Sequence, residues 1–145
     1  MKVKYRYSIS SDLNAIKELL SSESSDDRNI NKDKFLLALV KKEIVSCIRI
    51  KTLDEGVFEL SSLVVKEIYR KQKIGRDIVL EILKRDDRRP IYLLTKIELE
   101  NFYKLSNFKT IKPTDLPKVL YNEFNRIINF PFARNLEIIA MELIK

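Results

Sequence analysis

The chain has 145 residues, of which 45% are apolar and 34% charged, an ordinary balance for a globular protein with a real hydrophobic core. Its 28 basic and 21 acidic residues give a net charge of +7, which favours an anionic ligand, nucleic acid or surface without choosing among them. Histidine is absent and cysteine occurs once, so His-based triads, His or Cys-cluster metal sites and internal disulfides are excluded. Proton transfer must therefore fall to Glu, Asp, Tyr, Lys or water.

The chain carries no recognisable targeting or membrane segment. Its N-terminus alternates apolar and charged residues, and no apolar run reaches the roughly 18 residues that cross a bilayer. We therefore expect a single cytoplasmic domain over residues 1–145, without a membrane partner.

The first quarter of the chain predicts a strand, a helix and a polar connection. Apolar residues alternate with polar and mostly basic ones over residues 3–9, which is the period of a half-buried strand. Ser11 is a candidate N-cap for a helix with the apolar stripe Leu13, Ile16, Leu19 and Leu20. Residues 21–31 are mostly polar and predict a loop with room for a fragment of helix.

Three strands in antiparallel succession are predicted next. Residues 35–40 and 44–51 are strand-like runs separated by Lys41-Lys42-Glu43, which indicates a hairpin. Cys47, within the second run, is expected to be a buried core thiol. The turn Asp54-Glu55-Gly56 predicts a second hairpin into a strand over residues 57–65.

A basic bend and a helix follow this third strand. Residues 70–73 are basic and polar, and from Ile74 the apolar residues recur at the helical positions Ile74, Ile78, Val79, Ile82 and Leu83. The charged residues 84–89 and Pro90 end the helix. Because the unpaired N–H groups of a first helical turn and the helix dipole both favour an anion, we expect a phosphate site at this bend.

The rest of the chain continues the alternation of strands and helices. Residues 91–95 predict a strand parallel to residues 57–65, which places the basic bend at the C-terminal edge of the sheet. The pattern then predicts a helix over 98–106, a strand over 108–111, a helix capped by Thr114 that ends near Ile128, and a strand over 136–144.

This order of elements resembles the GNAT N-acetyltransferase superfamily over nearly the whole chain, and two motifs carry the resemblance. The family's phosphate loop has Gln or Arg, two variable residues, Gly, any residue, and Gly or Ala; here it reads Arg70-Lys71-Gln72-Lys73-Ile74-Gly75. The block 101–108, NFYKLSNF, is similar to a second family segment that contains Asn, Tyr and a Gly-Phe pair. Lys73 and Asn107 stand where the family usually has glycine.

The resemblance implies an α/β fold with a central twisted mixed sheet of about seven strands and about four flanking helices, in the order β-α-α-β-β-β-α-β-α-β-α-β. It implies acetyl-CoA as cofactor, with the pyrophosphate on the amides of residues 71–76 and the pantetheine arm along residues 63–65. Lys73 either obstructs the phosphate or adds a cation to it, and we favour the cation because Gly75 keeps the turn-closing role. The implied cofactor-binding residues are Leu63, Val64, Val65, Arg70, Lys71, Gln72, Lys73, Ile74, Gly75, Arg76 and Asn101.

The implied reaction is direct attack of a primary amine on the thioester in a ternary complex. Tyr103 is the candidate acid for the leaving thiolate, although an aromatic core position is the other interpretation. Glu59 is the candidate base, with a chain of waters as the alternative. The backbone N–H of Val64 or Val65 would polarise the thioester carbonyl.

The acceptor is not determined by the sequence, and a small-molecule or peptide amine is expected. Residues 115–126 faintly resemble the C-terminal segment of N-acetylglutamate synthases, which implies an amino-acid α-amine as the runner-up acceptor and Arg126 as a carboxylate partner. A CoA-binding regulatory module without catalysis is the alternative of another class. Scattered basic residues and the lack of a recognition motif speak against nucleic acid, and a monomer or homodimer is expected.

Overall fold

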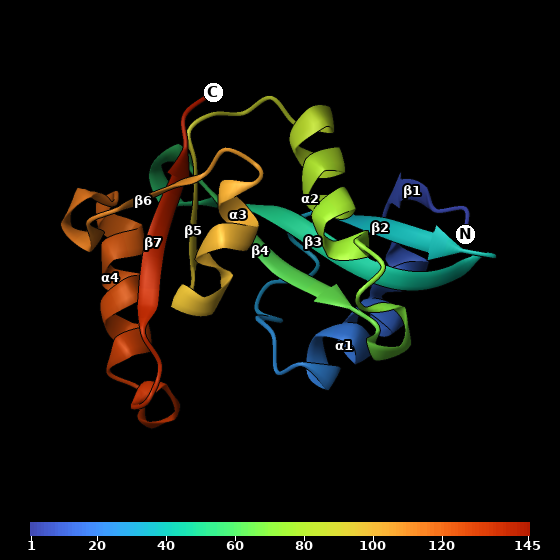
Figure 1. Ribbon diagram of the computed structural model, residues 1–145, viewed down its shortest axis with the longest axis horizontal. Helices are drawn as coiled ribbons and strands as arrows, with labels where there is room; N and C mark the ends of the chain where they lie inside the picture. Colours follow the sequence, from blue (N-terminus) through green and yellow to red (C-terminus); the bar gives the residue numbers. More distant parts are fainter. The chain divides into compact units, whose positions relative to one another are not determined.

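The structure is a computed structural model that describes residues 1–145, apart from the side chain of Phe132. Its seven strands form a mixed sheet in the order β1-β2-β3-β4-β5-β7-β6 (Figure 1). The strands are β1 (Lys4–Tyr7), β2 (Phe35–Val40), β3 (Glu43–Leu53), β4 (Val57–Val65), β5 (Ile91–Lys96), β6 (Lys109–Ile111) and β7 (Ile138–Leu143). The α-helices are α1 (Leu13–Ser22), α2 (Ile74–Arg85), α3 (Glu100–Lys104) and α4 (Lys118–Ile128). This architecture confirms the predicted fold class.

The chain divides into two compact units, each with its own apolar core. The first unit comprises Met1–Lys51 and Leu60–Asp87, and the second comprises Thr52–Glu59 and Arg88–Lys145. In the part of the chain that the structure describes, no helix is long and apolar enough to cross a membrane.

In the first unit β2 is covered on both faces, which explains its uninterrupted apolar sequence FLLALV. On one face Phe35 and Leu37 pack with Cys47, Val64 and the α1 stripe Ile16, Leu19 and Leu20. The alternate residues Leu36 and Ala38 are fully buried as well, and α2 contacts β2 (Figure 1). Cys47 is therefore the core thiol that the sequence predicts, and burial raises its pKa to about 12.

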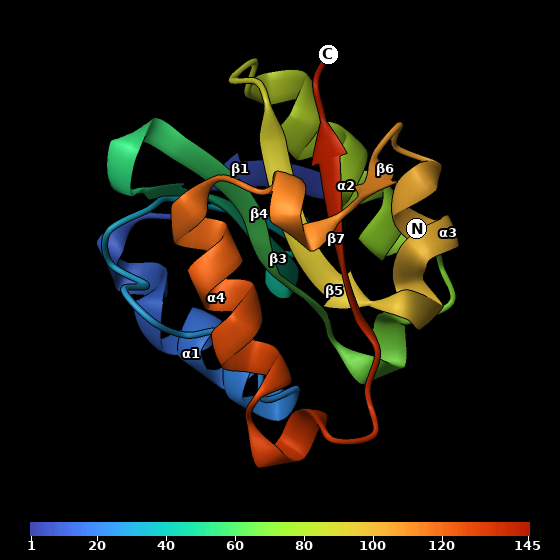
Figure 2. The same cartoon turned by 90° about the vertical axis from the view of Figure 1, so that its left-hand side faces the viewer.

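In the second unit α4 packs against β5 and β7 (Figure 2). Its apolar face, with Leu120 fully buried and Phe124 nearly so, contacts Ala140 of β7 and Tyr92 of β5. β7 pairs antiparallel with both β5 and β6, so the last strand of the chain lies between two earlier ones. β4 and β5 are parallel, with Glu59 opposite Tyr92, as the crossover rule predicts.

Three local expectations are corrected. A single α-helix, rather than two, joins β1 to β2, because the polar residues after Ser22 form turns. Ser11 lies inside a 3₁₀ turn, and the Asp12 carboxylate accepts hydrogen bonds from the Ile9 amide and the Arg6 guanidinium. α4 begins at Lys118, after Pro117, because Thr114 lies in a separate 3₁₀ turn.

Candidate functional site

The strand predicted to hold the thioester is interrupted at Ser62, which has a φ of 63°. Such a left-handed residue cannot continue the pleat, so the strict alternation of side chains along β4 breaks there. The Ser62 hydroxyl donates to the Asp26 carbonyl at 2.8 Å and accepts from Arg49 Nε at 3.0 Å. These contacts fix the position immediately before residues 63–65, of which Val64 is buried.

Arg49 is fully buried and connects this strand to the segment that follows α1. Its guanidinium donates to the carbonyl oxygens of Asp26, Arg28 and Asn29 at 3.2, 2.9 and 3.3 Å. It also lies over the Phe35 ring, 5.0 Å from the centroid. One cation thus donates to three carbonyl oxygens of residues 26–29.

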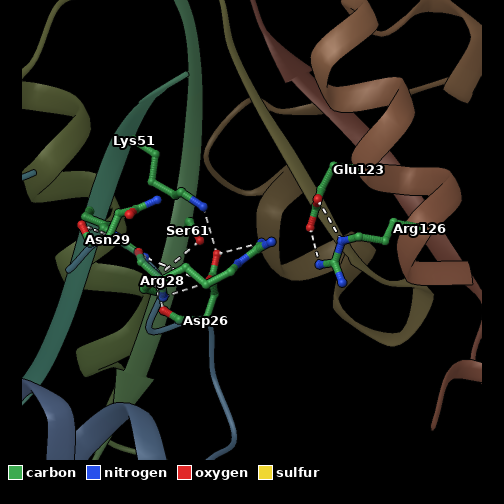
Figure 3. A network of polar contacts seen from close by, with 9 residues as sticks. Asp26, Arg28, Asn29, Lys51, Ser61, Glu123 and Arg126 are labelled. Carbon is green, nitrogen blue, oxygen red and sulfur yellow. Dashed lines mark hydrogen bonds and ion pairs between the residues drawn. The ribbon is translucent and has the colours of Figure 1, made fainter. Parts of the chain in front are cut away.

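The Asp26 side chain completes this network from the solvent side. Figure 3 shows Lys51 and Arg28 directed toward Asp26, with Lys51 Nζ at 2.8 Å and Arg28 Nε at 3.0 Å from its carboxylate. Hydrogen bonds from these two cations outweigh the desolvation of the carboxylate and hold the pKa of Asp26 well below its usual range. No motif in the sequence indicates this network; its sequence signal is the charged Arg49 and Lys51 inside a strand of apolar residues.

The basic bend after β4 has a backbone that the sequence did not predict. A 3₁₀ turn over Glu67–Tyr69 leads into Lys71 and Lys73, whose φ values are 66° and 64°. Gly75 is the second residue of α2, so it does not close the turn and the expectation that it supplies the glycine requirement is wrong. Lysines thus occupy both left-handed positions, where glycine would avoid the strain of a β-carbon.

The bend nevertheless presents the expected set of amides. The backbone N–H groups of residues 71–76 donate to no described group, and the first helical hydrogen bond of α2 runs from Asp77 to the Lys73 carbonyl at 2.9 Å. The dipole of this 12-residue helix reinforces the positive potential at its N-terminus. These amides can therefore bind an anion.

The basic side chains of the bend differ in whether they are already paired with an acidic residue. Arg70 forms an ion pair with Glu23 and donates to the Val65 carbonyl at 3.1 Å, while Arg76 pairs with Asp77 at 3.2 Å. The exposed ammonium groups of Lys71 and Lys73 make no ion pair with any described residue. The ammonium groups of Lys71 and Lys73 are therefore free to bind an anionic ligand, whereas the two arginines are already paired. Gln72, between the two lysines, is exposed.

In the second unit Tyr103 is buried on α3 between two aromatic rings. Its ring meets Phe102 edge-on at 4.9 Å and Phe108 at 6.0 Å between centroids. The hydroxyl makes no hydrogen bond to a described residue, and burial raises the pKa of Tyr103 to about 12.

The end of α3 fixes this ring through a helix-capping motif. Asn107 has a φ of 70°, and its amide donates to the Lys104 carbonyl while the Phe108 amide donates to the Tyr103 carbonyl. Together with the Tyr103–Phe108 ring contact, this is the Schellman arrangement. Asn107 therefore fills the conformational role of the family's glycine, because asparagine tolerates left-handed backbone.

Three other predicted residues of this unit have different environments. Glu59 on β4 is buried, 8% exposed. Asn101 on α3 is exposed, and its carbonyl accepts from the Leu105 amide at 3.3 Å. Arg126 on α4 donates to the Glu123 carboxylate at 2.6 and 3.0 Å (Figure 3).

Comparison with known proteins supports a common fold. N-acetylglutamate synthase from Neisseria gonorrhoeae, in complex with coenzyme A and N-acetyl-glutamate, is similar with a TM-score of 0.77 and 16% identity, covering 100% of this chain and 36% of that one. This chain thus spans about a third of the length of that synthase. A GNAT-family acetyltransferase from Staphylococcus aureus Mu50 matches with a TM-score of 0.70 and 23% identity over 97% of this chain and 98% of its own.

A third similar structure is Rv2747 from Mycobacterium tuberculosis in complex with CoA, with a TM-score of 0.71 and 19% identity over 98% of this chain and 99% of that one. A search of curated proteins finds no match. The family model described as an acetyltransferase (GNAT) domain matches residues 8–117, which include the basic bend, Glu59 and Tyr103. The chain therefore belongs to the GNAT acetyltransferase family.

Proposed function

We propose that this protein transfers an acetyl group from acetyl-CoA to a primary amine by direct attack of the amine. The observation that carries the proposal is the run of unpaired amides over residues 71–76 ahead of α2, flanked by the unpaired ammonium groups of Lys71 and Lys73. A pyrophosphate fits this array, because each of its oxygens accepts hydrogen bonds and its charge matches the helix dipole. Complexes of similar proteins with CoA support the same ligand.

The remaining predicted residues receive their roles within this proposal. Residues 63–65, just after the fixed Ser62, would lie along the pantetheine arm, and the N–H of Val64 or Val65 would polarise the thioester carbonyl. Arg70 would contribute through the backbone of the bend, since its guanidinium is held by Glu23 and Val65. Asn101 and the side chains of Gln72, Ile74 and Arg76 complete the proposed binding residues.

Tyr103 would assist departure of the thiolate by donating a hydrogen bond. A phenol with a pKa of about 12 stays protonated at neutral pH, but full transfer of its proton to a thiolate with an ordinary pKa of about 8.5 is unfavourable. The hydroxyl therefore stabilises developing charge on sulfur in the transition state. Glu59, or a water that it orders, would take the proton from the attacking ammonium.

Titration of acetyl-CoA by isothermal calorimetry tests the proposal at its first step. We expect saturable binding, followed by acetylation of some member of a panel of amino acids, polyamines and peptides. Binding without turnover on any acceptor would favour a CoA-binding regulatory module instead. No binding at millimolar acetyl-CoA would contradict both.

The second candidate acceptor is an amino-acid α-amine, favoured by the matching fold of N-acetylglutamate synthase. Arg126, the predicted carboxylate partner, would have to exchange its Glu123 contact for the substrate carboxylate. Acetylation of glutamate in preference to its decarboxylated analogue, with the preference lost in Arg126→Gln, would support this acceptor. Equal rates on both would exclude it.

A further inference from the structure

The edge of the first unit formed by β1 and the β2–β3 hairpin carries a groove that the proposed acetyl transfer does not use. The groove has a volume of about 830 Å³, within the range of sites for small organic ligands. Its apolar lining includes Leu39 and Val40. Two tyrosines and four lysines also line the groove, namely Tyr5, Tyr69, Lys2, Lys4, Lys41 and Lys42.

The charge of this groove is strongly positive. Among the described residues, none of the four lysines forms an ion pair, and no carboxylate lines the groove. Arg6, which also lines the groove, is paired with Asp12 at 2.8 Å. The two α2 carboxylates that act on the Tyr5 phenol, Asp77 and Glu81, are each paired with an arginine.

The hairpin tip places two of these lysines at a conformational cost. Val40 pairs with Glu43, so Lys41 and Lys42 form a two-residue turn, and their φ values are 50° and 68°. A turn with two left-handed residues favours Asn-Gly, since these residues adopt that backbone without strain. The chain does place asparagine at other left-handed positions, Asn29 and Asn107. Lysine at both tip positions therefore places two ammonium groups at the end of the hairpin, beside the groove.

We propose that this groove binds a nucleoside polyphosphate, distinct from the CoA held by the basic bend. The planar base would stack on the ring of Tyr5 or Tyr69. The phosphates would form ion pairs with the ammonium groups of Lys41 and Lys42 and with those of Lys2 and Lys4. The aromatic lining residues favour a base-bearing ligand over inorganic phosphate, and a volume of about 830 Å³ is that of a small-molecule site.

Calorimetric titration with ATP in the presence of saturating acetyl-CoA tests this assignment, because acetyl-CoA occupies the basic bend. We expect ATP to bind, more weakly as salt rises, and inorganic tripolyphosphate to bind at least about tenfold more weakly than ATP. Separate titration of acetyl-CoA shows independently whether the proposed function holds. ATP that acetyl-CoA displaces, or tripolyphosphate that binds as well as ATP, would overturn the assignment.

A double substitution distinguishes binding of ATP in the groove from nonspecific attraction of ATP to the positive net charge of the protein. Lys41→Asn with Lys42→Gly gives the turn its preferred residues, so the melting temperature should rise by about 4 °C while ATP affinity falls by roughly tenfold. The matched control Lys84→Gln with Lys118→Gln removes the same charge from exposed positions outside the groove and should leave ATP affinity unchanged. Equal loss in both variants, or no loss in the first, would contradict the proposal.

Discussion

Tyr103 is positioned by its own helix end rather than by hydrogen bonds to its hydroxyl. The capping residues Asn107 and Phe108 hold the backbone, and two aromatic rings hold the side chain. Its hydroxyl is left without a partner among the described residues, so it keeps a donor for a ligand. Both sequence interpretations of this residue, core aromatic and hydrogen-bond donor, are thus compatible with one geometry.

Replacing Tyr103 with Phe tests the donor role. The ring contacts are retained, so we expect little change in acetyl-CoA affinity and a fall in kcat of roughly ten- to a thousand-fold. Steady-state kinetics and calorimetry on the same preparation measure the two quantities. An unchanged kcat would make Tyr103 a packing residue only.

Arg49 shows how one buried cation can determine a loop. Removing its guanidinium takes the donor from the carbonyl oxygens of Arg28 and Asn29 and from the Ser62 hydroxyl, while the Asp26 carbonyl still accepts from Ser62. We expect Arg49→Met to lower the free energy of unfolding by about 3–5 kcal/mol, because buried polar groups are then unsatisfied.

Denaturant unfolding of Arg49→Met can be compared with that of Lys66→Met. Lys66 pairs with Glu43 at 2.7 Å, but both side chains are about 40% exposed, so loss of this pair should cost less than about 1 kcal/mol. Similar losses in the two variants would contradict the role given to Arg49.

At the scale of elements, the bend between β4 and α2 is the proposed phosphate site, and its backbone is left-handed at a position that the sequence did not predict. Lys73 occupies the N-cap position of α2 in left-handed conformation, without a side-chain cap. Lysine there costs about 1 kcal/mol relative to glycine. The gain that offsets this cost would be an ammonium group beside the proposed phosphate site.

Lys73→Gly separates the conformational cost from the charge. We expect the free energy of unfolding to rise by about 1 kcal/mol and acetyl-CoA affinity to fall by roughly three- to tenfold, since strain is relieved and a cation is lost. Thermal unfolding and calorimetry provide the two readouts. Tighter binding of acetyl-CoA by the variant would show that the lysine obstructs the phosphate instead.

At the scale of the whole molecule, two buried acids predict a loss of stability at alkaline pH. Burial raises the pKa of Cys47 from 9.0 to about 12 and that of Tyr103 from 10.0 to about 12. Both groups ionise more readily in the unfolded chain, so the stability is full below about pH 9 and falls as pH rises toward about 12. Each group should contribute a slope of about 1.4 kcal/mol per pH unit within its window.

Unfolding by denaturant across this range measures the slope, and Cys47→Ala supplies the control. In the unfolded chain the Cys47 thiol ionises at a lower pH than the Tyr103 phenol. Stability of the variant should therefore lose most of its pH dependence between about pH 9 and about pH 10. A slope that Cys47→Ala leaves unchanged would assign the alkaline transition to other groups.

The order of strands and helices follows from local patterns in the sequence. The run FLLALV is apolar at every position, and the spacing from Ile74 to Ile82 forms one helical stripe, so both elements were predicted within a few residues. The two motifs that carry the family resemblance likewise lie in contiguous residues. Short-range chemistry of this kind is visible without tertiary structure.

The left-handed residues and the buried charge network were decided only by the tertiary structure. The residue types at Lys71 and Lys73 do not predict a positive φ, because glycine and asparagine are the residues typical of that backbone. Arg49 contacts carbonyls 20 to 23 residues earlier in the chain, which no periodicity encodes. Sequence therefore determined the elements, whereas packing between distant segments determined the backbone of the basic bend, because only the folded chain supplies the contacts that offset left-handed strain and a buried charge.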